Sequence, residues 1–213
     1  MKERPTLFST PMVQAILDGR KTQTRRICKP QPIIDEESGY IFIGNTLFDI
    51  HDGDWQIPMY LKDIARWDIG DVLWVRETWN TLTAYEEKPD HSVMSVREFV
   101  YKADDDRFDK WKPSIFMPKE ACRIRLLVED VRVERLQDIS EEDAIAEGIE
   151  RKGEFFKSYQ KIHRGPHKGE EHPWNVFPNA SPKTSYYELW ESINGEGSWD
   201  KNPWVWVIEF TKL

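Results

Sequence analysis

The segment 203–210, close to the carboxyl end, constrains the fold more than any other part of the sequence. In a β-strand, alternate side chains point to opposite faces of the sheet, and both faces of this segment are apolar. One face carries Trp204, Trp206, Ile208 and Phe210, and the other carries Val205 and Val207. A strand that needs cover on both faces lies inside a sheet and not at its edge. The sequence therefore predicts a sheet in which 203–210 is a central strand.

Two further segments predict long strands. Segment 72–79 follows a Gly-Asp turn and ends in polar residues, among them Arg76 and Glu77. In segment 122–133 apolar and charged residues alternate, but the apolar phase shifts by one residue in the middle. Such a shift indicates a turn or a β-bulge at 129–130.

Three short helices are also predicted. The first, 10–17, has Thr10 as its cap and ends before Gly19, where a C-terminal glycine belongs. The second, 140–147, begins with a serine cap and an acidic first turn, and the third, 184–193, has apolar residues at helical spacing. Strands and helices do not alternate as βαβ units, so we expect an α+β domain on a curved or barrel-like sheet.

Composition places limits on the class of protein. The chain has 213 residues, of which 39% are hydrophobic, and ten tryptophans and ten phenylalanines supply apolar area for a core. Two cysteines do not make a disulfide framework, and we find neither an apolar signal segment nor a run of about 18 apolar residues. We therefore expect a cytoplasmic protein without a membrane span. The net charge of −8 argues against non-specific binding to a nucleic-acid backbone.

Positive charge is nevertheless concentrated near the amino end of the sequence. Residues 1–30 contain seven Lys and Arg against two acidic residues, and the run 19–26 is the densest part. A lysine among arginines has a lowered pKa, so a neutral Lys21 can take a proton from the Thr24 hydroxyl and activate it as a nucleophile. Strand geometry would place these two side chains on opposite faces, whereas a helical or turned segment would bring them together. The alternative is that the run is a solvated or phosphate-binding surface.

Other candidate residues are weaker when taken alone. Glu147, in the last turn of its helix, has the position of a proton carrier, but an exposed helix glutamate is the plainer interpretation. Arg76 and Glu77 either orient a polar ligand or form a structural ion pair. Three histidines occur within ten residues, His163, His167 and His172. They lack a cysteine pair and a helix to hold them, so we expect no metal and no cofactor.

The order of these motifs resembles the ASCH domain family. The resemblance is carried by the helix end and basic run at 16–25, by 70–75 and by the terminal strand at 204–210. Segments 74–79 and 138–144 are similar to the longer, prophage-associated ASCH proteins. The resemblance implies a PUA-like pseudo-β-barrel with flanking short helices. It also implies a cleft for RNA or a modified nucleoside.

The resemblance also implies a reaction. Some small bacterial members are amidohydrolases that remove the acetyl group from N(4)-acetylcytidine with a lysine, a threonine and a glutamate, which match Lys21, Thr24 and Glu147. In that scheme Thr24 attacks the amide carbonyl, Lys21 activates it and Glu147 carries a proton to the leaving amine. The arginines of the run, Arg20, Arg25 and Arg26, then form the electrostatic surround of the substrate, with Arg76 and Glu77 as further contacts.

The resemblance covers the chain in pieces, so we expect a single domain over 1–213 with three insertions. These lie at about 29–67, 84–112 and 150–183, and the last is predicted to be a loop or lid. A non-catalytic RNA-binding module and a ribonuclease of phage origin stay as alternatives. The sequence leaves the substrate and the oligomeric state undetermined.

Overall fold

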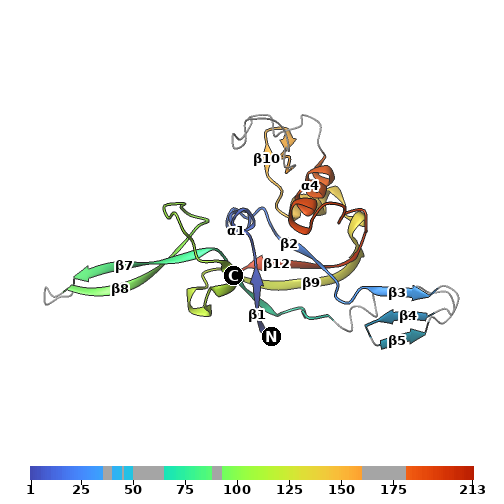
Figure 1. Cartoon of the computed structure of the whole chain (residues 1–213), viewed down its shortest axis with the longest axis horizontal. Helices are drawn as coiled ribbons and strands as arrows, with labels where there is room; N and C mark the ends of the chain where they lie inside the picture. Colours follow the sequence, from blue (N-terminus) through green and yellow to red (C-terminus); the bar gives the residue numbers. More distant parts are fainter. Residues whose placement is uncertain (36–39, 45, 50–64, 88–92, 160–180) are drawn as a thin grey trace.

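The computed structural model describes residues 1–35, 40–44, 46–49, 65–87, 93–159 and 181–213. Its centre is a five-stranded sheet in the order β1-β6-β9-β12-β2 (Figure 1). These strands are β1 (Glu3–Leu7), β2 (Gln23–Ile27), β6 (Val72–Arg76), β9 (Arg125–Arg135) and β12 (Trp204–Lys212). Strands β1 and β6 are parallel, and the other neighbours are antiparallel. The chain is therefore an α+β protein, as predicted.

Strand β12 has the central place that its two apolar faces predict. It pairs with β9 on one side and with β2 on the other. Trp206, Ile208 and Phe210 are buried in one hydrophobic cluster, whereas Val205 and Val207 are buried in another. The sheet thus has a core on each face, and β12 contributes to both.

The predicted irregularity in β9 is confirmed. Asp130 lies opposite Glu209, but Val128 lies opposite Phe210, so Glu129 is an extra residue in the ladder. Val128 and Val131 are three positions apart, so a regular strand would point them to opposite faces of the sheet. The bulge between them allows both side chains to be buried.

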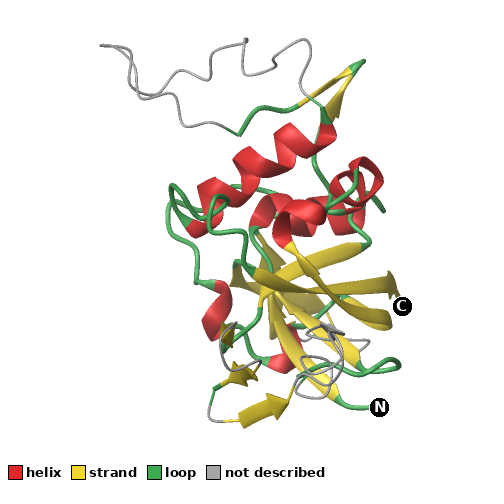
Figure 2. Cartoon of the chain, turned by 90° about the vertical axis from the view of Figure 1, so that its right-hand side faces the viewer, coloured by secondary structure: helices red, strands yellow, loops and turns green. Residues whose placement is uncertain are grey.

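Helices cover the sheet at one end of the molecule (Figure 2). They are α1 (Thr10–Leu17), α3 (Glu141–Ala146) and α4 (Pro182–Asn194). The chain also contains short 3₁₀ helices at Ser114–Phe116, Lys119–Ala121 and Leu136–Asp138. One prediction is wrong in detail: the cap of α1 is Ser9, and Thr10 is already helical. Gly19 follows this helix with φ of 73°, as a C-terminal glycine should. The α3 cap is confirmed, because the Ser140 hydroxyl accepts from the Asp143 N–H at 3.0 Å.

Parts of the three predicted insertions are more regular than the sequence indicates. Within 29–67, strands β3 (Pro32–Asp35), β4 (Tyr40–Ile43) and β5 (Thr46–Asp49) form a separate antiparallel sheet. Strands β7 (Trp79–Glu87) and β8 (Val93–Tyr101) form a long hairpin that overlaps the second insertion. A small hairpin of β10 (Arg151–Lys152) and β11 (Phe155–Phe156) lies in the third insertion, which was predicted to be a loop or lid, and residues 160–180 of this insertion lie outside the described residues. The hairpin β7–β8 and the sheet β3–β5 extend from opposite sides of the central sheet (Figure 1).

The expected barrel is not closed. Strands β1 and β2 are the edges of an open sheet, with no ladder between them in the described part of the chain. A side chain joins them instead: the Arg26 guanidinium donates to the Leu7 carbonyl at 2.8 Å. Within the described ranges, none of the helices has the length and apolarity needed to cross a membrane.

Candidate functional site

The basic run lies between the ends of two helices, not on an open surface. After α1, the N–H groups of Arg20 and Lys21 donate to the Ala15 carbonyl at 2.8 and 3.0 Å, which turns the chain towards β2. Lys21 then forms an isolated β-bridge with Glu147, the residue that ends α3. The Thr22 N–H donates to the Ala146 carbonyl at 2.9 Å. These backbone contacts hold Lys21 beside Glu147.

The Lys21 side chain is completely buried, with 0% of its surface exposed. Its Nζ lies 2.8 Å from Glu147 Oε2 and 2.8 Å from the Glu147 carbonyl oxygen. Burial lowers the pKa of Lys21 more than the Glu147 carboxylate raises it, and Arg26 and Arg25 lower it further. The lowered pKa agrees with the sequence-based argument, but burial is the main cause and the arginines are a lesser one.

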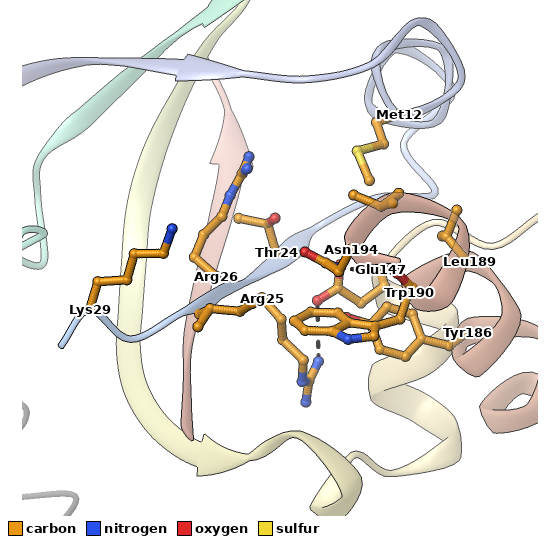
Figure 3. A pocket seen from close by; sticks show the side chains of 12 residues that line it. Met12, Thr24, Arg25, Arg26, Lys29, Glu147, Tyr186, Leu189, Trp190 and Asn194 are labelled. Carbon is orange, nitrogen blue, oxygen red and sulfur yellow. Dashed lines mark hydrogen bonds and ion pairs between the residues drawn. The ribbon is translucent and has the colours of Figure 1, made fainter. Parts of the chain in front are cut away.

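Thr24 lines a cavity together with the same glutamate. A cavity of about 260 Å³ separates β2 from α4, and both Thr24 and Glu147 line it (Figure 3). Lys21 is not among the residues that line the cavity, but its Nζ contacts Glu147, which is. Within the described part of the chain, we find no hydrogen-bond partner for the Thr24 hydroxyl. Of the two geometries considered above, the chain has the extended one: Lys21 lies in an isolated bridge and Thr24 lies in strand β2. Glu147 contacts Lys21 and lines the same cavity as Thr24.

Arg25 differs from its predicted role as part of an exposed cationic surround. Its side chain has 0% exposure, and its guanidinium lies 3.1 Å from Glu134, 3.0 Å from Asp143 and 3.3 Å from Glu147. Burial raises the pKa of Asp143, but Arg25, Gln23 and Arg132 together lower it by more, so the net pKa is below the ordinary value. The charged form of this carboxylate is therefore stabilised. The Nη1 and Nη2 groups of this guanidinium thus fix Glu147 and its neighbours. Arg25 also lines the cavity, and its buried Nε has no hydrogen-bond partner among the described residues.

The other two arginines of the run have partial exposure. Arg20 pairs with Asp18 at 2.8 Å and donates to the Gly148 carbonyl at 3.0 Å. Arg26 lines the cavity, and its guanidinium carbon lies 5.3 Å from the centre of the Phe8 ring. Of the three predicted arginines, Arg25 and Arg26 line the cavity, and Arg26 is the more exposed of these two.

Arg76 and Glu77 lie away from this cavity. Glu77 accepts from Arg123 Nε and Nη2, both at 2.9 Å, and its N–H contacts Met117 Sδ. The Arg76 guanidinium donates to the Met117 carbonyl at 3.1 Å and to the Ile115 carbonyl. Of the two interpretations that the sequence leaves open, these contacts favour the structural ion pair. The proposed substrate contacts gain no support.

Sequence analysis missed the contribution of α4. Tyr186, Leu189, Trp190 and Asn194 line the cavity together with Met12 of α1 (Figure 3). Burial and the Glu147 carboxylate raise the pKa of Tyr186 well above its usual range, so it faces the site as a neutral phenol. Helical spacing marked Tyr186 as core. The signal that the sequence offered is the tyrosine hydroxyl: a purely apolar core position would accept phenylalanine, whereas a buried hydroxyl indicates a polar surrounding.

No group of three or more His, Cys, Asp or Glu side chains in the described ranges is arranged to hold a metal ion. The three histidines named above, His163, His167 and His172, lie outside the described residues. Comparison of the chain with family models, with curated proteins and with solved structures finds no match.

Proposed function

We propose that this chain is an amidohydrolase that removes the acyl group from an N(4)-acylated cytidine. Thr24 is the proposed nucleophile, Lys21 its base and Glu147 the proton carrier. One observation carries the proposal: a lysine without exposed surface lies 2.8 Å from a glutamate that shares a cavity with a threonine whose hydroxyl has no hydrogen-bond partner among the described residues.

Burial of this ion pair supports a chemical role. Removing an ammonium group from water costs several kcal/mol, and a hydrophobic pair of the same size is often as stable. Arg25 already connects Glu147 to Glu134 and Asp143, so Lys21 is not needed to hold this glutamate. A buried lysine with a lowered pKa beside a cavity is the environment in which a lysine acts as a base.

The geometry suits a neutral Lys21. A neutral amine has two N–H bonds and one lone pair, and the two contacts to Glu147 use the two N–H bonds. The lone pair is then available for the Thr24 proton.

In the proposed reaction the Thr24 oxygen attacks the amide carbon, and its proton passes to Lys21. The C–N bond breaks, Glu147 relays the proton to the departing amine, and the acyl group remains as an ester on Thr24. Water then attacks this ester, which releases the carboxylic acid and restores the hydroxyl.

We further propose that the central sheet with α1, α3 and α4 is a PUA-like fold of the ASCH type. All five strands of the central sheet lie outside the three predicted insertions, and β2, β6 and β12 overlap the segments that carry the resemblance. Strands β3, β4, β5, β8, β10 and β11, and the end of β7, lie within the insertions and form separate sheets. The division of the chain inferred from the resemblance therefore follows the division in strand pairing, apart from the first part of β7.

The test is absorbance-monitored hydrolysis of N(4)-acetylcytidine. We expect turnover by the wild type and a fall in kcat/KM of about 10²- to 10⁴-fold in Lys21→Met. Arg25 still pairs with Glu147 in this variant, so no carboxylate is left without a cation. Lys102→Met, which removes an exposed lysine paired with Asp106, is the matched control. Absence of turnover by the wild type, or equal turnover by Lys21→Met, would overturn the proposal.

A non-catalytic RNA-binding module is the second candidate, and one observation favours it. A groove beyond the cavity is lined by Lys29 and Lys201 and shares Ile27, Lys29, Ile193 and Asn194 with it. Phosphate contacts there would make RNA affinity fall steeply as salt rises. Hydrolysis of a neutral nucleoside should instead change little between about 50 and 200 mM salt. Salt-sensitive RNA binding without turnover would favour this second candidate.

A further inference from the structure

A second cavity lies on the other side of Glu147, between α1 and α4. Its volume is about 370 Å³, and its wall includes Pro11, Gln14, Tyr159 and Ser192. It shares four residues with the first cavity: Met12, Glu147, Leu189 and Ile193. The proposed proton carrier therefore stands at the boundary between two spaces.

An amide hydrolase needs room on both sides of its reacting carbon. One substituent of the amide is the leaving amine and the other is the acyl chain, and they extend in different directions from the carbonyl. The cavity beside Thr24 continues into the groove with Lys29 and Lys201, which suits the polar nucleoside and its sugar. The space between α1 and α4 is then left for the acyl chain.

The walls of this second space suit an apolar chain. Pro11, Met12, Leu189 and Ile193 contribute its apolar surface. The charged groups beside them are already paired, Arg20 with Asp18 and Lys157 with Glu150, each at 2.8 Å. The volume also exceeds the needs of an acetyl group, because a water molecule, similar in size to a methyl group, occupies about 30 Å³ in the liquid.

From these observations we propose that the space between α1 and α4 is an acyl-chain pocket, and that the substrate carries an apolar acyl group longer than acetyl. This inference rests on the proposed hydrolase function. Ser192 is the proposed specificity position, because it lines this pocket and not the cavity beside Thr24. Its side chain is exposed and, among the described residues, bonds within its own helix, to the Leu189 carbonyl at 2.7 Å, so a larger residue there should not disturb the core.

The experiment compares kcat/KM for N(4)-acetylcytidine and N(4)-hexanoylcytidine. We expect the hexanoyl compound to be the better substrate by at least about tenfold, since each buried methylene contributes up to about fourfold. Ser192→Trp fills the pocket and should lower the hexanoyl-to-acetyl ratio at least about tenfold. The control Ser95→Trp places the same side chain on the exposed surface of β8 and should leave the ratio unchanged.

Each outcome decides the question. A ratio near one in the wild type, or a ratio that Ser192→Trp does not change, would overturn the acyl-chain pocket while leaving the hydrolase proposal intact. If neither compound is hydrolysed, the hydrolase proposal fails, and calorimetric Kd values for the two compounds test the pocket by itself. Tighter binding of the hexanoyl compound that is lost in Ser192→Trp would support the pocket, and equal Kd values would contradict it.

Discussion

Lys21 is the residue that the rest of the site is built to hold. Its Nζ has two acceptors on Glu147, its backbone is bridged to the same residue, and the Phe8 ring lies 5.9 Å away. Burying a charged ammonium group costs free energy, and Arg25 already supplies a cation for the carboxylates at this point. This arrangement stabilises the neutral amine, which is the form that can accept a proton.

The first prediction concerns the titration of Lys21. Because its pKa in the folded state lies below the ordinary 10.5, the folded protein binds fewer protons than the unfolded chain between these two pKa values. The free energy of unfolding should therefore rise with pH across that window. The ¹³Cε resonance of Lys21, identified by its absence in Lys21→Met, should titrate below 10.5. In Glu147→Gln the midpoint should move lower still, because the carboxylate raises this pKa. A midpoint at or above 10.5 would contradict the account.

The second prediction concerns the glycine behind the lysine. Gly148 has φ of 87°, and an added Cβ would lie 2.7 Å from Lys21 Cβ and 2.9 Å from Ala15 Cβ. Gly19 has a similar φ of 73° but no atom within 4 Å of such a Cβ. Gly19→Ala should thus cost only the backbone strain, about 1–2 kcal/mol, whereas Gly148→Ala adds overpacking of about 1–3 kcal/mol. Urea unfolding measures both variants, and equal losses would show that the close approach to Lys21 does not matter.

At the scale of elements, α3 is small but decides where Glu147 lies. It has six residues, begins at the Ser140 cap and ends as Glu147 takes the C-cap position. Such a short helix is not stable alone, so its cap and its packing against α4 have to fix it. Ala144 of α3 is packed in the cluster that also contains Tyr186 and Trp190 of α4.

The third prediction tests this cap. Ser140→Ala removes the hydrogen bond to the Asp143 N–H and should lower the free energy of unfolding by about 1 kcal/mol. Ser9 is the matched control, because it occupies the N-cap position of α1 without a side-chain hydrogen bond. Ser9→Ala should therefore change stability by only a few tenths of a kcal/mol. Chemical denaturation compares the two, and equal effects would mean that the Ser140 bond contributes nothing.

Elements with a buried side were predictable from the sequence. Strand β12 and helix α4 show apolar periodicity, because their side chains pack against a core. The bulge at Glu129 appears in the sequence as a shift in the apolar phase of β9. The hairpin β7–β8 was missed over most of its length. At its base, Trp79, Phe99 and Tyr101 pack in a small hydrophobic cluster. The rest extends from the body of the molecule (Figure 1) and is paired through its ladder, so its sequence carries little apolar pattern. Polar sequence of this kind does not distinguish a hairpin from a loop.

At the scale of the whole molecule, the site is made of parts that are far apart in the sequence. Lys21 and Glu147 are separated by 126 positions, and α4 supplies another wall of the cavity. Residue types and spacing identified Lys21 and Thr24 as a candidate pair, but they did not bring Glu147 to them. That assignment came from the resemblance. Nor did the local sequence reveal that Arg25 is buried among three carboxylates, because those carboxylates come from β9 and α3.

The different surroundings of Arg25 and Arg26 follow from the same long-range contacts. Strand β2 alternates, so Arg25 turns towards Glu134 and Asp143, whereas Arg26 turns towards Leu7 on the far edge of the sheet. A basic run on one strand therefore divides into an arginine held by carboxylates and a partly exposed one, although both line the cavity. Such a division depends on the neighbouring strands, which a local pattern does not specify.

The most direct test of the central claim is the hydrolysis of N(4)-acetylcytidine by Thr24→Val. The valine has nearly the shape of threonine, and the Thr24 hydroxyl has no hydrogen-bond partner in the described part of the chain, so the fold should be unaffected. Thr22→Val is the matched control, two residues earlier and exposed. We predict that Thr24→Val retains its thermal stability but hydrolyses no faster than the uncatalysed control, while Thr22→Val retains the wild-type rate. Hydrolysis by Thr24→Val at the wild-type rate would contradict the assignment of Thr24 as the nucleophile.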